Sequence, residues 1–248
     1  MATSYGAICT DFYVNLTLSV KMDLPEDRGT VMEFCDRVRN DLPDMSRFQR
    51  FEDELALESR RHEGEYRWLA LRQNCVRCGH VNPESFDDAY RLHRLILQLA
   101  PFYLSINPLD LDSLELTFGF DLECKANHHQ IVHEALLGGS PLGGLLDYAG
   151  ASPIDVQPAL GMMISGPPEL HAFVEVKTRT PARHVRRGRY RSEPISVFVT
   201  MRHMGSLESV DQLPTLFESM HEQLDALAQE KVVGELLMPI SRAILNSP

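Results

Sequence analysis

Apolar and mostly polar side chains alternate over residues 10–22, and this period of two constrains the fold more than any other feature of the sequence. Successive side chains of a strand point to opposite faces, so the pattern indicates a strand with one buried side. Residues 114–124 repeat the alternation. The expected buried positions are Phe12, Val14, Leu16, Leu18, Val20 and Met22 in the first strand and Leu114, Leu116, Phe118, Phe120 and Leu122 in the second.

Helical periodicity separates these two strands. Apolar residues recur at helical spacing in residues 28–42, which Pro43 follows, and again in residues 86–99, which end before Pro101. Between the helices, residues 51–58 and 66–73 are typical of two strands that a turn at Gly64 joins into a hairpin. The order strand, helix, two strands, helix, strand predicts a ferredoxin-like βαββαβ unit.

The second half of the chain predicts further strands and a helical C-terminus. Strands are expected at residues 156–165, 171–180 and 195–203, and an apolar stripe predicts a helix at 209–229 that continues toward Leu245. The glycine-rich residues 138–144 are expected to form a flexible connection. We therefore predict an α+β protein whose ferredoxin-like βαββαβ unit is extended by an antiparallel sheet and C-terminal helices. Its two halves, residues 1–126 and residues 127–248, are expected to pack as one unit.

Composition is typical of a globular protein of the cytoplasm. The 248 residues are 44% hydrophobic, and they contain no run of about 20 apolar residues that a membrane-spanning helix needs. Residues 1–11 carry no Lys or Arg, which predicts no secretory signal. Five dispersed cysteines are not the even set of a disulfide scaffold. The net charge of -11 opposes unspecific binding to nucleic acid and to anionic membranes, so no membrane contact is expected.

Three parts of the sequence carry a family resemblance. They are residues 114–117 (LELT), residues 195–199 (ISVFV), and the helix positions Phe217, His221 and Leu237. With them the chain resembles a sporadically distributed family of uncharacterised bacterial proteins of about this length. That family places a βαββαβ unit before further strands and a C-terminal helix, so the resemblance implies the same fold here. It implies no activity, cofactor or binding residue.

Cys75-Val76-Arg77-Cys78-Gly79-His80 is the sharpest local motif in the sequence. Two cysteines at this spacing, followed by glycine, form the tight knuckle that presents two thiolates to zinc, the one cofactor that the motifs suggest. The sequence contains no second CxxC, so His80, Cys124 or the histidines at 128, 129 and 133 are needed to complete the ligands. The same cysteines also suit a redox pair, or two apolar side chains packed inside the protein.

A second set of candidate metal ligands consists of Cys124, His129 and His133. The two histidines are four residues apart, so a helix places them on one face, as joint metal binding requires. Glu134 follows His133 directly, so the order is not the HExxH motif of metalloproteases. Histidines at a junction of strand and helix more often cap, form hydrogen bonds or face water, and both interpretations stay open at this point.

The largest anomaly is a basic segment, residues 177–191 (KTRTPARHVRRGRYR), with seven basic residues and no acidic one. The remaining chain holds 17 basic against 35 acidic residues. Pro181 and Gly188 predict a protruding loop between two strands, where arginine forks can grip phosphates or carboxylates and His184 or Tyr190 can stack on bases. The expected binding residues are Lys177, Arg179, Arg183, Arg186, Arg187, Arg189, Tyr190 and Arg191.

Three kinds of partner suit this segment: the protein's own acidic surface or a neighbouring copy in an oligomer, a nucleic acid, and an acidic protein or small anion. The sequence contains no convincing set of catalytic residues. We therefore expect a non-catalytic binding or accessory protein, associated with itself or with a protein partner, that contacts an anionic partner through the basic segment. The alternative is an enzyme, either a metal-dependent hydrolase that uses Cys75 and Cys78 or an RNA-processing nuclease.

Overall fold

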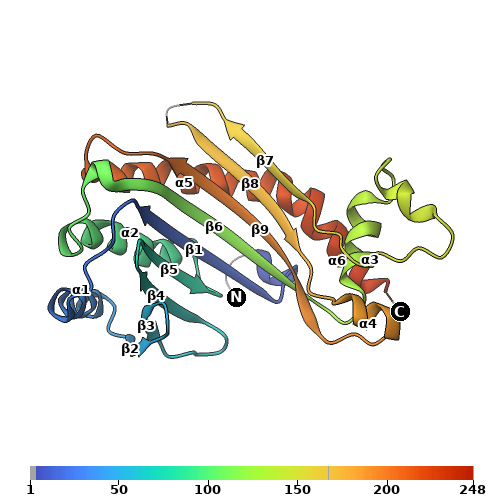
Figure 1. The fold of residues 1–248 in the computed structure, drawn as a ribbon, viewed down its shortest axis with the longest axis horizontal. Coiled ribbons are helices and arrows are strands. Elements are labelled where there is room, and N and C mark those ends of the chain that lie inside the picture. The colour runs from blue at the N-terminus through green and yellow to red at the C-terminus, as the bar shows by residue number, and fades with distance from the viewer. Residues whose placement is uncertain (1–3, 167, 248) are drawn as a thin grey trace.

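The computed structural model describes residues 4–166 and 168–247 and shows an α+β protein built on one antiparallel sheet (Figure 1). The sheet has nine strands in the order β2-β3-β4-β5-β1-β6-β9-β8-β7. The long helices pack on one face of the sheet, and the opposite face is turned toward the viewer in Figure 1. The predicted α+β class is confirmed.

The strands are β1 Asp11–Val20, β2 Met45–Arg50, β3 Leu55–Ser59, β4 Tyr66–Arg72, β5 Cys75–Val81, β6 Leu111–Cys124, β7 Ala159–Ile164, β8 Leu170–Lys177 and β9 Glu193–Met204. The helices are α1 Arg28–Asp41, α2 Phe86–Tyr103, α3 His128–Val132, α4 Ala182–Arg187, α5 Leu213–Leu227 and α6 Met238–Leu245. A π-helical stretch, Ala228–Leu237, joins α5 to α6. None of the described helices is both long and apolar enough to cross a membrane.

Side chains just outside α1 and α2 explain where these helices begin. Asp27 accepts a hydrogen bond from the amide of Thr30, and Ser85 accepts one from the amide of Asp88, so each caps free N–H groups of the first turn. The predicted end of α2 before Pro101 is wrong, because the helix continues to Tyr103. Pro101 lies in the last turn, where its missing N–H removes only one hydrogen bond.

Four strands, rather than the expected two, lie between α1 and α2. The strand expected at 51–58 is interrupted by a turn in which the amide of Phe51 donates to the carbonyl of Glu54 (2.8 Å), so β2 precedes the turn and β3 follows it. The strand expected at 66–73 is β4, and the CxxC motif after it forms a separate strand, β5. β2 lies at the edge of the sheet with most side chains exposed, so it carries no alternation that could predict it.

A ferredoxin-like unit lies at the centre of the sheet, but its hairpin consists of β4 and β5 and not of the strands expected at 51–58 and 66–73. β4, β5, β1 and β6 are neighbours in this order. The hairpin of β2 and β3 extends the unit at one edge, and β9, β8 and β7 extend it at the other. Pairing of β6 with β9 runs from Ser113 opposite Met204 to Cys124 opposite Glu193, so one sheet spans the N-terminal and C-terminal halves.

The alternation in β1 places its apolar side chains between the sheet and the helices. The five alternate residues from Phe12 to Val20 are at most 2% exposed, whereas Met22, which lies beyond the end of β1, is 70% exposed. Four aromatic rings surround the ring of Phe12 with centroids 5.0–5.8 Å away: Tyr5, Phe86, Phe118 and Phe120. This aromatic cluster joins the start of α2 to the centre of the sheet.

Candidate functional site

The open face of the sheet carries aromatic side chains in two rows that cross the strands. Antiparallel pairing places the members of each row side by side on the face away from the helices. One row consists of Trp68, Gly79, Asn15, Thr117, Thr200 and Phe173. The next row consists of Tyr66, Val81, Tyr13, Gly119 and Phe198.

Two glycines in these rows make room for larger neighbours. A Cβ atom at Gly119 would lie 2.0 Å from the ring of Tyr13, so the ring lies directly over the backbone of β6. A Cβ atom at Gly79 would lie 2.2 Å from Asn15 Oδ1 and 2.6 Å from Trp68 Nε1. Aromatic rings therefore cover the backbone of the central strands and form the floor of the open face.

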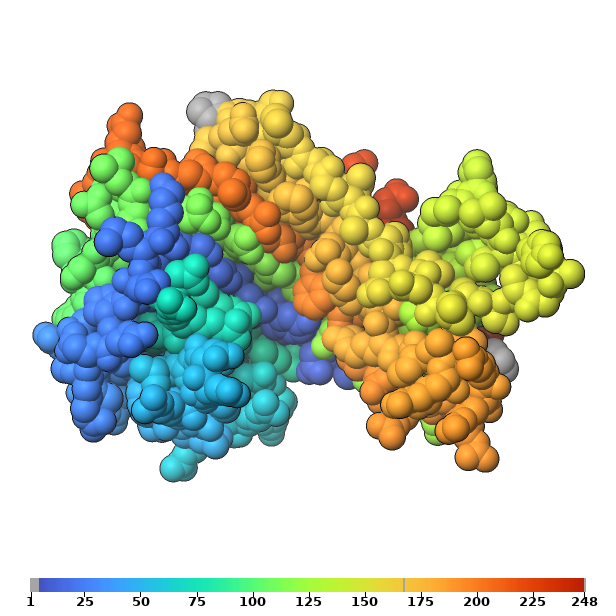
Figure 2. Space-filling model, viewed as in Figure 1, coloured from blue at the N-terminus to red at the C-terminus, as the bar shows by residue number. Residues whose placement is uncertain are grey.

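A cavity of about 490 Å³ opens onto this floor, which is within the range of small-ligand sites. Its walls include the aromatic side chains of Tyr13, Tyr66 and Trp68. Asn15 also lines it, and its Oδ1 is buried without a hydrogen-bond partner. Figure 2 shows the central strands recessed between the blue-to-cyan mass that includes β2, β3 and β4 and the orange mass around α4.

Two carboxylates, Asp11 and Asp121, face each other across β1 and β6 in the cavity wall. Asp11 accepts a hydrogen bond from Asn82 Nδ2 at 2.6 Å. Asp121 accepts one from the hydroxyl of Ser196 and a longer one, at 3.5 Å, from that of Tyr13. Burial raises the pKa of Asp121, and the charge of Asp11 adds to the rise. The cavity therefore offers negative charge and hydrogen-bond acceptors beside its aromatic rings.

Two arginines lie over aromatic rings of the same face. The guanidinium carbon of Arg61 is 4.3 Å from the ring centre of Tyr66, and that of Arg77 is 5.5 Å from the ring of Trp68. Neither arginine forms an ion pair with a carboxylate in residues 4–166 or 168–247. Stacking on a ring orients each planar cation and leaves its N–H groups available for an anion.

A larger hollow of about 730 Å³ lies near the beginning of α1 and the hairpin of β2 and β3. Its walls come mainly from α1 and from residues 48–55, where Arg50, Glu52, Asp53 and Glu54 contribute charges of both signs. Such mixed and exposed walls select no ligand chemistry. The smaller cavity, with its aromatic floor and buried acceptors, is therefore the better candidate for a binding site.

The basic segment, residues 177–191, connects β8 to β9 at one end of the sheet (Figure 1). The predicted simple loop is wrong, because Ala182–Arg187 forms the short helix α4. Gly188 ends this helix in the left-handed conformation, with φ at 58°. Pro181 and Gly188 suit the two ends of a helix as well as they suit a loop, so the sequence did not distinguish the two.

The arginines of α4 and of the residues after it are exposed and unpaired. None of them forms an ion pair with a carboxylate in the described part of the chain: Arg183, Arg186, Arg187, Arg189 and Arg191. Tyr190, between the last two, is half-buried. These five arginines therefore give no described ion pair in support of the interpretation in which the segment neutralises the protein's own acidic surface.

The first residues of the segment adjoin the cavity. Lys177 pairs with Glu175 on its own strand at 3.0 Å. Arg179 donates to the carbonyl of Pro194, and its charge opposes the rise in pKa that burial causes at both Tyr13 and Asp121. Lys177 lies two strands from Asp121, because Ser196 of β9 pairs with both. The basic segment therefore begins near the cavity, although none of its residues lines the cavity.

Buried histidines fasten the basic segment to the rest of the fold. His129 is 4% exposed, and its Nε2 donates to the carbonyl of Thr180 at 2.8 Å. Its Nδ1 accepts hydrogen bonds from the amide of Val156 (3.1 Å) and the hydroxyl of Thr178 (3.0 Å). His128 Nδ1 accepts one from the amide of Arg179, also at 3.1 Å. These bonds attach residues 178–180 at the start of the segment to α3.

Cys124, His129 and His133 do not gather into a metal site in this structure. Both nitrogens of His129 are used in hydrogen bonds, and His133 Nε2 donates to the carbonyl of Gly143 at 3.1 Å. Cys124 is buried at the end of β6. Of the two interpretations of these histidines, hydrogen bonding is the one that the structure shows.

The structure separates Cys75 from Cys78. Both belong to β5, and residues three apart on a strand point to opposite faces. Cys75 is partly exposed on the open face, whereas Cys78 and His80 are 0% exposed on the helix side. The expected knuckle is not formed, because β5 pairs with β1 and β4 along its whole length. In this arrangement the two thiols do not share a metal ion or a disulfide.

Iodoacetamide is expected to modify Cys75 at least about ten times faster than Cys78 in the native protein, because only an accessible thiolate reacts. Burial raises the pKa of both thiols, and Cys78 is completely enclosed. Trypsin cleaves after Arg77, so mass spectrometry measures each cysteine in its own peptide. Protein unfolded in urea is the control and should react equally at both. Equal rates in the native protein, or protection of both thiols by zinc, would contradict the strand geometry.

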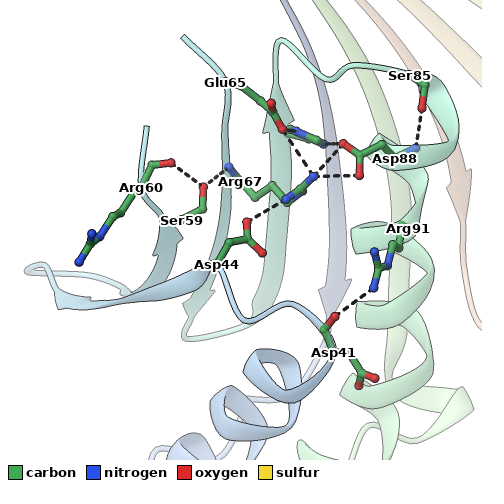
Figure 3. A network of polar contacts seen from close by, with 10 residues as sticks. Asp41, Asp44, Ser59, Arg60, Glu65, Arg67, Ser85, Asp88 and Arg91 are labelled. Carbon is green, nitrogen blue, oxygen red and sulfur yellow. Dashed lines mark hydrogen bonds and ion pairs between the residues drawn. The ribbon is translucent and has the colours of Figure 1, made fainter. Parts of the chain in front are cut away.

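Glu65, His80 and Asp88 form a cluster of metal-type ligands, with ligand atoms within 4.8 Å of one another. Arg67 already pairs with both carboxylates of this cluster, since its guanidinium lies 2.7 Å from Asp88 Oδ2 and 3.5 Å from Glu65 Oε1 and also pairs with Asp44 at 2.8 Å (Figure 3). His80 Nε2 donates to Glu65 at 2.9 Å, and burial lowers the pKa of His80. The cluster is therefore an ion-pair network that joins β4, β5 and α2.

No protein-family model matches the chain, and no curated protein matches it either. The resemblance to a family of uncharacterised bacterial proteins stays a prediction. The function must therefore be argued from the geometry of the open face and the basic segment.

Sequence reasoning found the basic segment but missed the aromatic cavity. One signal was present, because Tyr13 stands at a solvent-facing position of the alternating strand, where a polar residue is more usual. Trp68 and Asn15 gave no such signal. They become neighbours only through the pairing of β4, β5 and β1.

Proposed function

We propose that this protein is a non-catalytic binding protein that holds an anionic partner through the basic segment, residues 177–191. The observation that carries the proposal is the set of five exposed arginines on and after α4 that form no ion pair with a described carboxylate. Guanidinium groups bind phosphates and carboxylates through paired hydrogen bonds, so these arginines suit an external anion.

The charge distribution directs an anion to this segment. The chain outside it carries 17 basic and 35 acidic residues, so most of the surface repels a polyanion. Within the segment, the arginines repel one another until an anion neutralises them. The hydrogen bonds of His128 and His129 hold the base of the segment in place, so less conformational entropy is lost when an anion binds.

Heparin, a polyanion that carries no nucleobases, tests this proposal. The test variant changes Arg183, Arg186, Arg187 and Arg189 to Ser. Binding of fluorescein-labelled heparin is measured by fluorescence anisotropy at several salt concentrations. We expect the test variant to bind more weakly, with a salt dependence of log K that falls by about one for each arginine that contacts the polyanion.

The matched control changes four exposed arginines on and near the helix side to Ser: Arg28, Arg37, Arg39 and Arg50. It has the same net charge as the test variant, so it separates the position of the charges from their number. Heparin affinity of the control is expected to stay within about two-fold of the native protein, since long-range effects of surface charges are screened by salt. The proposal fails if both variants lose affinity equally, or if the native protein does not bind heparin.

A further inference from the structure

We infer that the anionic partner is a single-stranded nucleic acid whose bases stack on Trp68 and Tyr13 in the open-face cavity while its phosphates contact the basic segment. This inference rests on the proposed function, because it names the partner of the same surface. The cavity supports it separately, because the residues that line the cavity suit a base and not merely an anion.

The aromatic floor is the first argument. The solvent-facing side of an antiparallel sheet is ordinarily polar, yet here the two cross-strand rows bring Trp68, Tyr13, Tyr66 and Phe198 onto it. Gly79 and Gly119 leave the space in which two of these rings lie over neighbouring strands. Rings held at a solvent-facing surface stack on bases of any sequence, because every base has a π face.

The hydrogen-bond acceptors of the cavity are the second argument. The carboxylates of Asp11 and Asp121 lie in the cavity wall, where a bound base can reach them. Unpaired bases present N–H donors along their edges, whereas a duplex uses these donors in base pairs. The acceptors therefore suit the edge of an unpaired base. The same carboxylates repel phosphates, so the backbone of a bound strand must run outside the cavity.

Two arginines beside the cavity supply positive charge for that backbone. Arg61 lies over Tyr66 in the cavity wall and Arg77 lies over Trp68, and neither forms a described ion pair. A base that stacks on Trp68 displaces the guanidinium of Arg77, which then has its N–H groups free for a phosphate. The basic segment begins at Lys177, two strands from Asp121, and supplies further exposed arginines on that side of the cavity.

Among further acids on the open face, Glu58 opposite Trp68 and Glu123 beyond Asp121 form no ion pair with a described residue, whereas two others are paired within the protein. Glu115 pairs with Arg202 at 2.6 Å, and Glu175 pairs with Lys177 at 3.0 Å. Base-binding chemistry in the centre and phosphate-binding chemistry around it fit a nucleotide strand. An acidic polypeptide supplies the charge but lacks the rings that would stack on Trp68 and Tyr13.

Trp68 is the only tryptophan in the chain, so it reports directly on stacking. We would titrate the native protein with a mixed-sequence RNA of about ten nucleotides, the length range of single-strand sites. Comparison strands are the matched DNA, the duplex RNA, and an abasic strand with the same number of phosphates. Trp68 fluorescence is expected to be quenched by a single strand that has bases, and to change little with the abasic strand or the duplex.

Variants locate the contacts by anisotropy with the labelled RNA. Trp68→Leu and Tyr13→Leu are each expected to weaken binding about ten-fold or more, since each removes a stacking surface. Phe102→Leu is the matched control, because Phe102 is 74% exposed on α2, away from the open face. Circular dichroism and thermal unfolding check that each variant is folded. The fluorescence of the native protein needs no variant, so a variant that fails to fold does not remove the test.

The outcomes separate this inference from the proposed function. The stacking inference is overturned if the RNA and the abasic strand bind equally well and Trp68 fluorescence is not quenched. The proposed function still stands in that case if the arginine variant loses this binding. The same holds if heparin binds through the basic segment and no nucleic acid binds. Loss of heparin binding in the matched control as well as the test variant overturns the proposed function itself.

Discussion

Replacing Arg67 with alanine is expected to lower the free energy of unfolding by about 2–3 kcal/mol, because its ion pairs are partly buried and lie between exposed pairs and fully buried ones in strength. The side chain of Arg67 is 16% exposed and reaches Asp88, Asp44 and Glu65. Without it, the carboxylates of Glu65 and Asp88 remain beside the buried ring of His80 with no cation to neutralise them. The link between β4 and the first turn of α2 is lost with the guanidinium (Figure 3).

Urea unfolding followed by circular dichroism measures this effect. Arg67→Lys keeps the charge but cannot contact several carboxylates with one planar group, so we expect a loss between that of the alanine variant and zero. Arg39→Ala is the control on the surface of α1, where Arg39 and Asp36 form an exposed pair. It should change the free energy of unfolding by less than about 1 kcal/mol. The network has no stabilising role if Arg67→Ala behaves like Arg39→Ala.

Replacing His129 with alanine is expected to lower the free energy of unfolding by about 2–4 kcal/mol. The change removes the partner of the Val156 amide, the Thr180 carbonyl and the Thr178 hydroxyl at a site that is 4% exposed. A buried polar group without a partner costs about 1–3 kcal/mol, and water entering the space left by the ring recovers part of that cost. The basic segment loses its hydrogen bonds to His129 at the same time and keeps those to His128.

Hydrogen exchange and a control variant distinguish the loss of this attachment from a general loss of packing. Hydrogen exchange of the amides near Val156 and Arg179 is expected to accelerate more than exchange in β1 and β6, because the lost bonds are local. His184→Ala, on the half-exposed face of α4, serves as the control and should leave both stability and exchange nearly unchanged. Uniform acceleration across the whole sheet in His129→Ala would show that His129 supports the core and not the segment.

Elements with a strong local pattern could be predicted from the sequence. β1 and β6 followed from alternation alone, and α1 and α2 followed from helical spacing. β2 and β5 did not, because one is an exposed edge strand and the other combines cysteine, arginine and histidine without a clear period. The knuckle predicted from the CxxC motif was wrong, because the spacing of two cysteines does not reveal whether the backbone between them turns or extends.

The sequence determined one part of the candidate site, and the tertiary structure decided the rest. The concentration of positive charge in residues 177–191 is a property of the residues themselves, so the sequence alone determined that a strongly basic segment exists. Whether its arginines find carboxylates depends on which parts of the acidic chain lie nearby, and only the tertiary structure decided that five of them have no described ion-pair partner. The same holds for the aromatic cavity. Tyr13 lies beside Val81 and Gly119 because β1 pairs with two strands that are distant in the chain. That register is set by the burial of the whole apolar face of the sheet, which no local stretch of sequence contains.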